Sequence, residues 1–185
     1  MMFKFKNHNL ELYNTLLSLS RNLYFYNTIN LKDVFETRIY LMFIHFSLIL
    51  IIFKKNRTIF PQKNYDDFFH SIENNLRELG QGDVAVNKKM KDLNKILYDI
   101  LLKINKSANS LEINKDLIVK YFPQFKDSLN AKYVLFEDYL INFYHFCFEL
   151  SPENMIKDAI KFKDYNGCTK KKDINFKKKD EKISS

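Results

Sequence analysis

Apolar residues recur along most of this chain at intervals of three and four, which is the spacing of one face of an α-helix. No run of residues alternates between apolar and polar side chains over the length typical of a half-buried strand. The pattern therefore predicts an all-α protein, with one domain of about six to seven helices.

The first half of the chain divides into three predicted helices. The spacing of Leu16, Leu19, Leu23 and Tyr26 indicates the first. Asp33, with Glu36 three residues later, resembles a capping box and predicts a long helix that continues to about residue 53. Pro61 interrupts the pattern, and a third helix is predicted over residues 62–79. The side chains expected to point inward from this third helix are Phe68, Phe69, Ile72, Leu76 and Leu79.

The second half opens with the clearest apolar stripe in the chain, formed by Val86, Met90, Leu93, Leu97, Ile100 or Leu101, and Ile104. Further helices are predicted over residues 111–122 and 129–150. Ser151 and Pro152 have the residue types of an N-cap and a first helical position, so they predict a last helix that fades near residue 162. We assign residues 1–163 to the helical domain and predict that residues 164–185 form a disordered, lysine-rich tail.

Two of the three glycines, Gly80 and Gly82, lie in one short segment between predicted helices. Gly80 can end the preceding helix in the left-handed conformation, and Gly82 can complete the reversal. Asp83 is then the predicted N-cap of the next helix. A nucleotide-binding loop is disfavoured, because a helix precedes the glycines where that loop needs a strand, and because Asp83 would face the phosphates.

The net charge of +8 changes this picture less than it first suggests. Residues 170–185 contribute +4 of it, so the helical domain is only mildly basic. Lys88, Lys89, Lys91 and Lys95 form the main basic cluster of that domain. Such a cluster is most often a solvated helix face, but it could also contact anionic lipid headgroups or ribosomal RNA.

Two strongly apolar segments have alternative interpretations. Residues 41–53 are shorter than the roughly 20 residues of a membrane-spanning helix, which favours a buried core helix over an interfacial one. Residues 136–148 are apolar on more than one side. They favour a central helix buried all round, and the alternative is a groove for an apolar partner.

Few residues have the spacing of catalytic or metal-binding groups. The histidines lack zinc or di-iron spacing, and Asp66 with Asp67 lacks the further acid of a diphosphate-binding pattern. We expect no catalytic residue, metal or cofactor. Arg38 and His45 share a helix face, and we predict that Arg38 pairs with Glu78 or Asp83 of the glycine segment.

The segment NLRELGQGDVAVNKKMK closely resembles a motif of the ubiquinol–cytochrome c chaperone family. The matching residues are Leu76, Arg77, Glu78, Gly80, Gly82 and Asp83, followed by Lys88, Lys89, Met90 and Lys91. Upstream, the residues that match in order and spacing are Arg21, Phe25, Tyr26, Asp33, Arg38 and His45. The chain departs from the family pattern at Thr37, where glycine is common, and after Tyr98, where Asp99 and Ile100 replace Gly-Arg.

The resemblance implies a non-catalytic assembly chaperone that binds newly made cytochrome b and assists maturation of ubiquinol–cytochrome c reductase. Its implied partners are cytochrome b, the inner-membrane surface, the ribosome near its exit site and a small partner protein. The implied location is the bacterial cytoplasm, peripheral to the inner membrane. Two other functions stay open from the residues alone, a basic helical RNA- or ribosome-binding protein and a helical isoprenoid-type enzyme.

Overall fold

The computed structural model describes residues 10–107, 110–126 and 131–167. Apart from one bridge between Asn105 and Ile113, these residues form helices, turns and loops. The described α-helices are α1 (Glu11–Ser20), α2 (Phe35–Lys55), α3 (Gln62–Glu78), α4 (Asp83–Lys103), α5 (Lys115–Tyr121), α6 (Ala131–Phe148) and α7 (Pro152–Asp158). The predicted all-α fold and its seven helices are confirmed.

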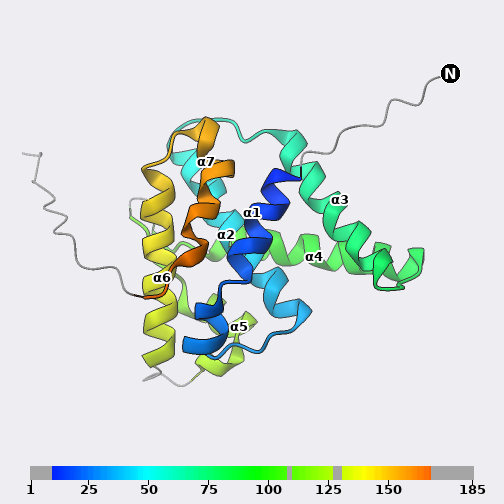
Figure 1. Ribbon diagram of the computed structural model, residues 1–185, viewed down its shortest axis with the longest axis horizontal. Coiled ribbons are helices and arrows are strands. Elements are labelled where there is room, and N and C mark those ends of the chain that lie inside the picture. The colour runs from blue at the N-terminus through cyan, green and yellow to red at the C-terminus, as the bar shows by residue number, and fades with distance from the viewer. Residues whose placement is uncertain (1–9, 108–109, 127–130, 168–185) are drawn as a thin grey trace, which may run out of the picture.

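Helix α2 is the centre of the fold and packs against α1, α4 and α6 (Figure 1). Between residues 41 and 53 its side chains are buried, except for the half-buried Leu50 and Ile51. Its length and composition would allow it to cross a membrane, but most of its apolar surface is covered by the other helices. The prediction of a buried core helix is confirmed.

The prediction of one continuous N-terminal helix through Tyr26 is wrong. Helix α1 ends at Ser20, and a π-helical turn, Tyr24–Thr28, follows it. The side chain of Asn22 accepts a hydrogen bond from the backbone N–H of Tyr24 at 2.8 Å, which competes with continuation of the helix. As a result Leu23 is 68% exposed, although its spacing predicted burial.

The capping residues also differ from those predicted. Helix α2 begins at Phe35 after an N-cap at Val34, and the carboxylate of Asp33 bonds to Arg38 instead of capping the helix. Helix α4 begins at Asp83 itself, with Gly82 at the N-cap position. Of the side chains predicted to point inward from α3, Leu79 is exposed, since it lies beyond the last turn of that helix.

Helix α6 is buried on one broad face and exposed on the other. Phe136, Leu140 and Phe143 are fully buried, whereas Val134 is 53% exposed and Phe148 is 44% exposed. The prediction that this segment is buried all round is therefore wrong, and α2 has that position instead. The apolar stripe predicted for α4 is confirmed by the burial of Val86, Leu93, Leu97, Ile100 and Ile104.

The packed part of the chain continues beyond the boundary predicted at residue 163. A 3₁₀ segment, Ala159–Asp164, follows α7, and Tyr165 then packs on Tyr24, Tyr139 and Phe162 with ring centroids 5.0–5.3 Å apart. Asn22 donates a hydrogen bond to the backbone oxygen of Tyr165 at 2.9 Å. Residues 164–167 thus belong to the helical body, and the rest of the predicted tail, residues 168–185, lies outside the described residues.

Candidate functional site

A groove of about 540 Å³ lies where α1, α2 and α3 meet. Its floor is apolar and its rim carries charged side chains, a combination suited to holding a polypeptide segment. Three residues singled out by the sequence motif, Arg21, Arg38 and Glu78, line it together. The full lining is Tyr13, Leu17, Arg21, Phe35, Arg38, Ile39, Met42, Ile72, Asn75, Glu78 and Leu79.

Arg38 lines the groove and is oriented by Asp33. The Nε and Nη2 atoms of Arg38 donate to the two carboxylate oxygens of Asp33 at 2.6 and 2.8 Å. These bonds hold the pKa of Asp33 below its usual value and raise the pKa of Arg38. The predicted pairing of Arg38 with Glu78 or Asp83 is therefore wrong, because Asp33 provides both carboxylate oxygens from a position five residues earlier.

Tyr26 belongs to the same group of motif residues. Its hydroxyl donates to the backbone oxygen of Ser20 at 2.5 Å. Burial, followed by the nearby charge of Asp33, raises the pKa of Tyr26 to about 12, while Arg38 and Arg21 act in the opposite direction. The phenol is therefore neutral at physiological pH and links the end of α1 to the start of α2.

Two charges on the groove rim are free to contact another molecule. Arg21 and Glu78 are exposed and form no ion pair with any described residue. Both act on Tyr13, whose pKa is raised mainly by burial, lowered by the hydrogen bond from Asn75 and by Arg21, and raised by Glu78. A cation and an anion thus flank the apolar floor.

The glycine turn lies next to this groove, at the end of the α3–α4 hairpin that projects from the other helices (Figure 1). Gly80 has φ +82°, and the N–H groups of Gly80 and Gln81 donate to the carbonyls of Arg77 and Leu76. This is a Schellman motif, which confirms the predicted role of Gly80 as the residue that ends α3.

Gly82 has a different status from Gly80. Its φ is −71°, and a Cβ added there would meet no atom within 4 Å. The turn itself therefore does not require glycine at this position. Beside it, Arg77 pairs with Glu73 at 2.8 Å and with Asp83 at 3.3 Å, which ties the end of α3 to the start of α4.

His45 is fully buried and far from any surface site. Its Nδ1 lies 2.6 Å from the Leu41 oxygen, and its Nε2 lies 2.9 Å from the Tyr139 hydroxyl. Since a carbonyl can only accept, Nδ1 carries the proton and the Tyr139 hydroxyl donates to Nε2. Burial lowers the pKa of His45 to about 4, so the ring is neutral and fixes α2 against α6.

One lysine of the basic run on α4 forms an ion pair within the chain, and two others are exposed. Lys88 and Lys91 are exposed, Met90 is half-buried, and Lys89 pairs with Glu36 of α2 at 3.5 Å. Leu76 is fully buried and belongs to the core. Tyr98 is 54% exposed, and its side chain is hydrogen-bonded to the side chain of Tyr65 on α3.

Asp99, where the chain departs from the family pattern, joins α4 to α5. Its carboxylate accepts hydrogen bonds from Lys103, and from Lys120 and Tyr121 at 2.6 Å each. These donors hold the pKa of Asp99 well below its usual range. Asp99 thus joins α4 to α5 through an ionic contact within the chain.

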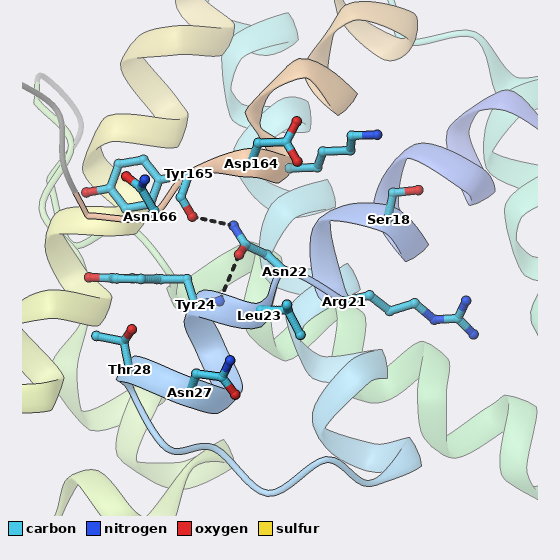
Figure 2. Close-up of a pocket in the computed structure, with 11 residues that line it drawn as sticks. Ser18, Arg21, Asn22, Leu23, Tyr24, Asn27, Thr28, Asp164, Tyr165 and Asn166 are labelled. Atoms are coloured by element: carbon cyan, nitrogen blue, oxygen red, sulfur yellow. Dashed lines mark hydrogen bonds between the residues drawn. The ribbon is translucent and has the colours of Figure 1, made fainter.

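Sequence reasoning missed a second, more polar pocket of about 500 Å³ beside the π-helical turn. Asn22 bridges Tyr24 and Tyr165 on its wall, and Arg21 points away from both (Figure 2). Arg21 also lines the α1–α2–α3 groove, so it lies between the two depressions. The sequence signal that could have indicated this turn is Asn22 itself, because an asparagine side chain can accept a hydrogen bond from the backbone N–H two residues later, here that of Tyr24.

The described residues offer little for metal or diphosphate chemistry. Asp66 is exposed and accepts from Gln62, whereas Asp67 is buried and pairs with Lys63, so the two carboxylates do not form one site. No group of three or more histidine, cysteine, aspartate or glutamate side chains within the described ranges could hold a metal ion.

Comparison with known proteins gives one match. No curated protein and no solved structure matches this chain. A family model described as Ubiquinol-cytochrome C chaperone matches residues 27–119, about half of the chain. The match covers Asp33, Arg38, His45 and the glycine turn, extends into α5, and begins after Arg21 and Tyr26. The chain belongs to the ubiquinol–cytochrome c chaperone family.

Proposed function

We propose that this protein is a non-catalytic chaperone that binds newly made cytochrome b during assembly of ubiquinol–cytochrome c reductase. Family membership supports the assembly role. The observation that supports the binding site is the α1–α2–α3 groove, in which Arg21 and Glu78 flank an apolar floor and have no partner among the described residues.

The groove has the composition expected of a protein-binding surface. Leu17, Phe35 and Leu79 supply apolar contact area, and Asn75 and Tyr13 supply hydrogen-bonding groups. Burial of apolar side chains in such a floor provides most of the affinity, and rim charges select the register of the partner. A client segment with an acidic residue opposite Arg21 and a basic residue opposite Glu78 would satisfy both charges.

The same proposal places the protein in the bacterial cytoplasm at the surface of the inner membrane, where cytochrome b is inserted. A ribosome near its exit site and a small partner protein are further contacts compatible with this role. Lys88 and Lys91 are exposed for such contacts, while Lys89 is engaged within the chain.

Affinity purification of the tagged protein from mildly solubilised membranes tests the proposal. We expect cytochrome b to be enriched with the wild type and depleted by about tenfold with Arg21→Glu, since charge reversal places an anion beside the partner's acid. Lys106→Glu is the matched control, because Lys106 is also an exposed cation and follows the opposite end of α4 from the glycine turn.

Other outcomes would reject the proposal. Equal cytochrome b recovery with Arg21→Glu and Lys106→Glu would exclude the groove as the binding site. Recovery of ribosomal proteins without cytochrome b would favour an RNA- or ribosome-binding protein, provided that the amount recovered falls steeply as the salt concentration rises.

A further inference from the structure

The loop between α2 and α3, residues 56–60, exposes one large aliphatic side chain. Ile59 is 90% exposed, whereas the next residue, Phe60, packs on Phe46 and Phe53 with ring centroids 5.4 and 5.1 Å apart. Phe60 thus fixes one end of the loop to the core and leaves Ile59 in solvent.

The other end of the loop is fixed by the backbone. The N–H of Thr58 donates to the Phe53 oxygen at 2.9 Å, and the N–H of Arg57 donates to the Lys54 oxygen at 3.1 Å. This Schellman motif puts Arg57 at φ +54°, a conformation that disfavours side chains other than glycine and asparagine. Arginine at this position carries backbone strain, and its side chain adds a cation to the loop.

The loop is also basic. Lys54, Lys55 and Arg57 are exposed and form no ion pair within the described part of the chain. No acidic residue occurs between residues 50 and 65. The Lys55 ammonium lies 5.5 Å from the centre of the Tyr144 ring, which brings the end of α6 to the same region.

Neighbouring elements extend this surface. The loop crosses the end of the molecule where α6 gives way to α7 (Figure 1). Phe148, the last residue of α6, has an exposed ring. Glu149 and Glu153 come after it in the chain, and neither forms an ion pair with a cation of the loop. The surface therefore combines exposed apolar side chains with three cations that form no ion pair with any described residue, and two acids lie at its α6–α7 edge.

We propose that residues 54–59 bind a bilayer containing anionic lipids, with Ile59 inserted among the headgroups and Lys54, Lys55 and Arg57 on the phosphates. Interfacial binding of this kind takes its energy from buried apolar area and from cations near an anionic surface. RNA is less well matched, because it would contact the cations and leave the 90% exposed aliphatic side chain of Ile59 in water, whereas a bilayer interface buries it. The choice of a membrane rests on the proposed function, which requires contact with a membrane client.

This orientation leaves the α1–α2–α3 groove accessible. Met42 is the groove residue of α2 nearest to the loop, and Lys54 lies in the last turn of that helix, so about 18 Å of helix separates the groove from the bilayer. The glycine turn is also remote from the loop (Figure 1).

Co-sedimentation of the full-length protein with lipid vesicles tests the inference. One set of vesicles contains equal amounts of phosphatidylglycerol and phosphatidylcholine, and the other contains phosphatidylcholine alone. We expect binding to the first set only, weakened about tenfold by Ile59→Ser and about fivefold for each of Lys54→Gln and Lys55→Gln. Leu102→Ser is the control for Ile59→Ser, because Leu102 is an aliphatic residue that is 76% exposed on α4.

Lys88→Gln combined with Lys91→Gln is the control for the lysine changes. The inference would be overturned if this pair of changes or Leu102→Ser abolished vesicle binding while the loop variants still bound. It would also be overturned if no loop variant weakened vesicle binding. Vesicle binding with no recovery of cytochrome b would reject the proposed function alone. Recovery of cytochrome b with no vesicle binding would reject this inference alone.

Discussion

The carboxylate of Asp33 holds the guanidinium of Arg38 in a two-point contact, with Nε to Oδ1 at 2.6 Å and Nη2 to Oδ2 at 2.8 Å. Both residues lie within the span matched by the family model, and Arg38 lines the groove. The contact is partly exposed, with 36% of the Arg38 side chain and 53% of the Asp33 side chain accessible. Its main consequence is therefore the orientation of Arg38 in the groove and not the stability of the fold.

Asp33→Asn should separate these two effects. The variant removes the anionic partner, so we expect the free energy of unfolding measured in urea to change little. Recovery of cytochrome b should fall by several-fold, because Arg38 is no longer held toward the groove. Asp92→Asn is the matched control, since Asp92 is similarly exposed and pairs with Lys95 on α4. A large loss of stability in Asp33→Asn would show that the contact is structural.

The two glycines of the turn should respond differently to alanine. Gly80→Ala places a side chain at φ +82° and should lower the free energy of unfolding by about 1 kcal/mol. Gly82→Ala should be neutral or slightly stabilising, because its φ is −71° and open space surrounds the new methyl group. Thermal unfolding of both variants measures this. A stable Gly82→Ala protein that fails to bind cytochrome b would show that a partner approaches the turn closely.

The helices could be predicted from the sequence because burial imposes a periodic pattern. The stripe on α4 and the left-handed Gly80 are local properties of the chain, and both were predicted correctly. The partner of Arg38 was not, since the prediction considered only Glu78 and Asp83 of the glycine segment, and Asp33 lies five residues before Arg38 in the chain. The break after Ser20 was also missed, because the spacing of Leu23 imitates a helix that Asn22 interrupts.

The groove could be predicted only in part. The motif identified its charged residues Arg21, Arg38 and Glu78. Its floor residues Leu17 and Met42 have the spacing of ordinary core positions, and which of them face a depression depends on how three helices meet. Tyr165 lies in a lysine-rich segment whose composition predicts disorder, yet its ring finds an aromatic cluster that the sequence does not place nearby.

Arg57→Gly should have opposite effects on stability and on membrane binding. Glycine accepts φ +54° without strain, so the free energy of unfolding should rise by roughly 0.5–1 kcal/mol. Loss of the cation should weaken binding to phosphatidylglycerol vesicles by about fivefold. Urea unfolding and co-sedimentation measure the two quantities. Unchanged vesicle binding in a stabilised protein would remove Arg57 from the proposed surface.

Asp99→Asn should loosen the contact between α4 and α5. The change removes the charge that accepts from Lys103, Lys120 and Tyr121, and 17% of the Asp99 side chain is exposed. We expect a loss of about 1–2 kcal/mol in the free energy of unfolding at neutral pH. Since the pKa of Asp99 is lowered in the folded protein, the same stabilisation should disappear as the pH falls below the value of an ordinary aspartate. Asp92→Asn again serves as the control, and an equal effect of both changes would contradict the role of Asp99.

The buried His45 predicts a loss of stability in mild acid. Its pKa is about 4 in the folded protein and about 6.5 when exposed, so between these values the unfolded chain binds the additional proton. Its contribution should be complete above pH 6.5 and should fall by about 3 kcal/mol as the pH approaches 4, below which it changes no further. The combined variant His45→Leu and Tyr139→Phe removes both hydrogen-bonding partners and keeps an apolar core. Its urea-unfolding free energy should depend less on pH than that of the wild type in this range. Identical pH profiles would show that His45 binds its proton at the same pH in the folded protein as in the unfolded chain.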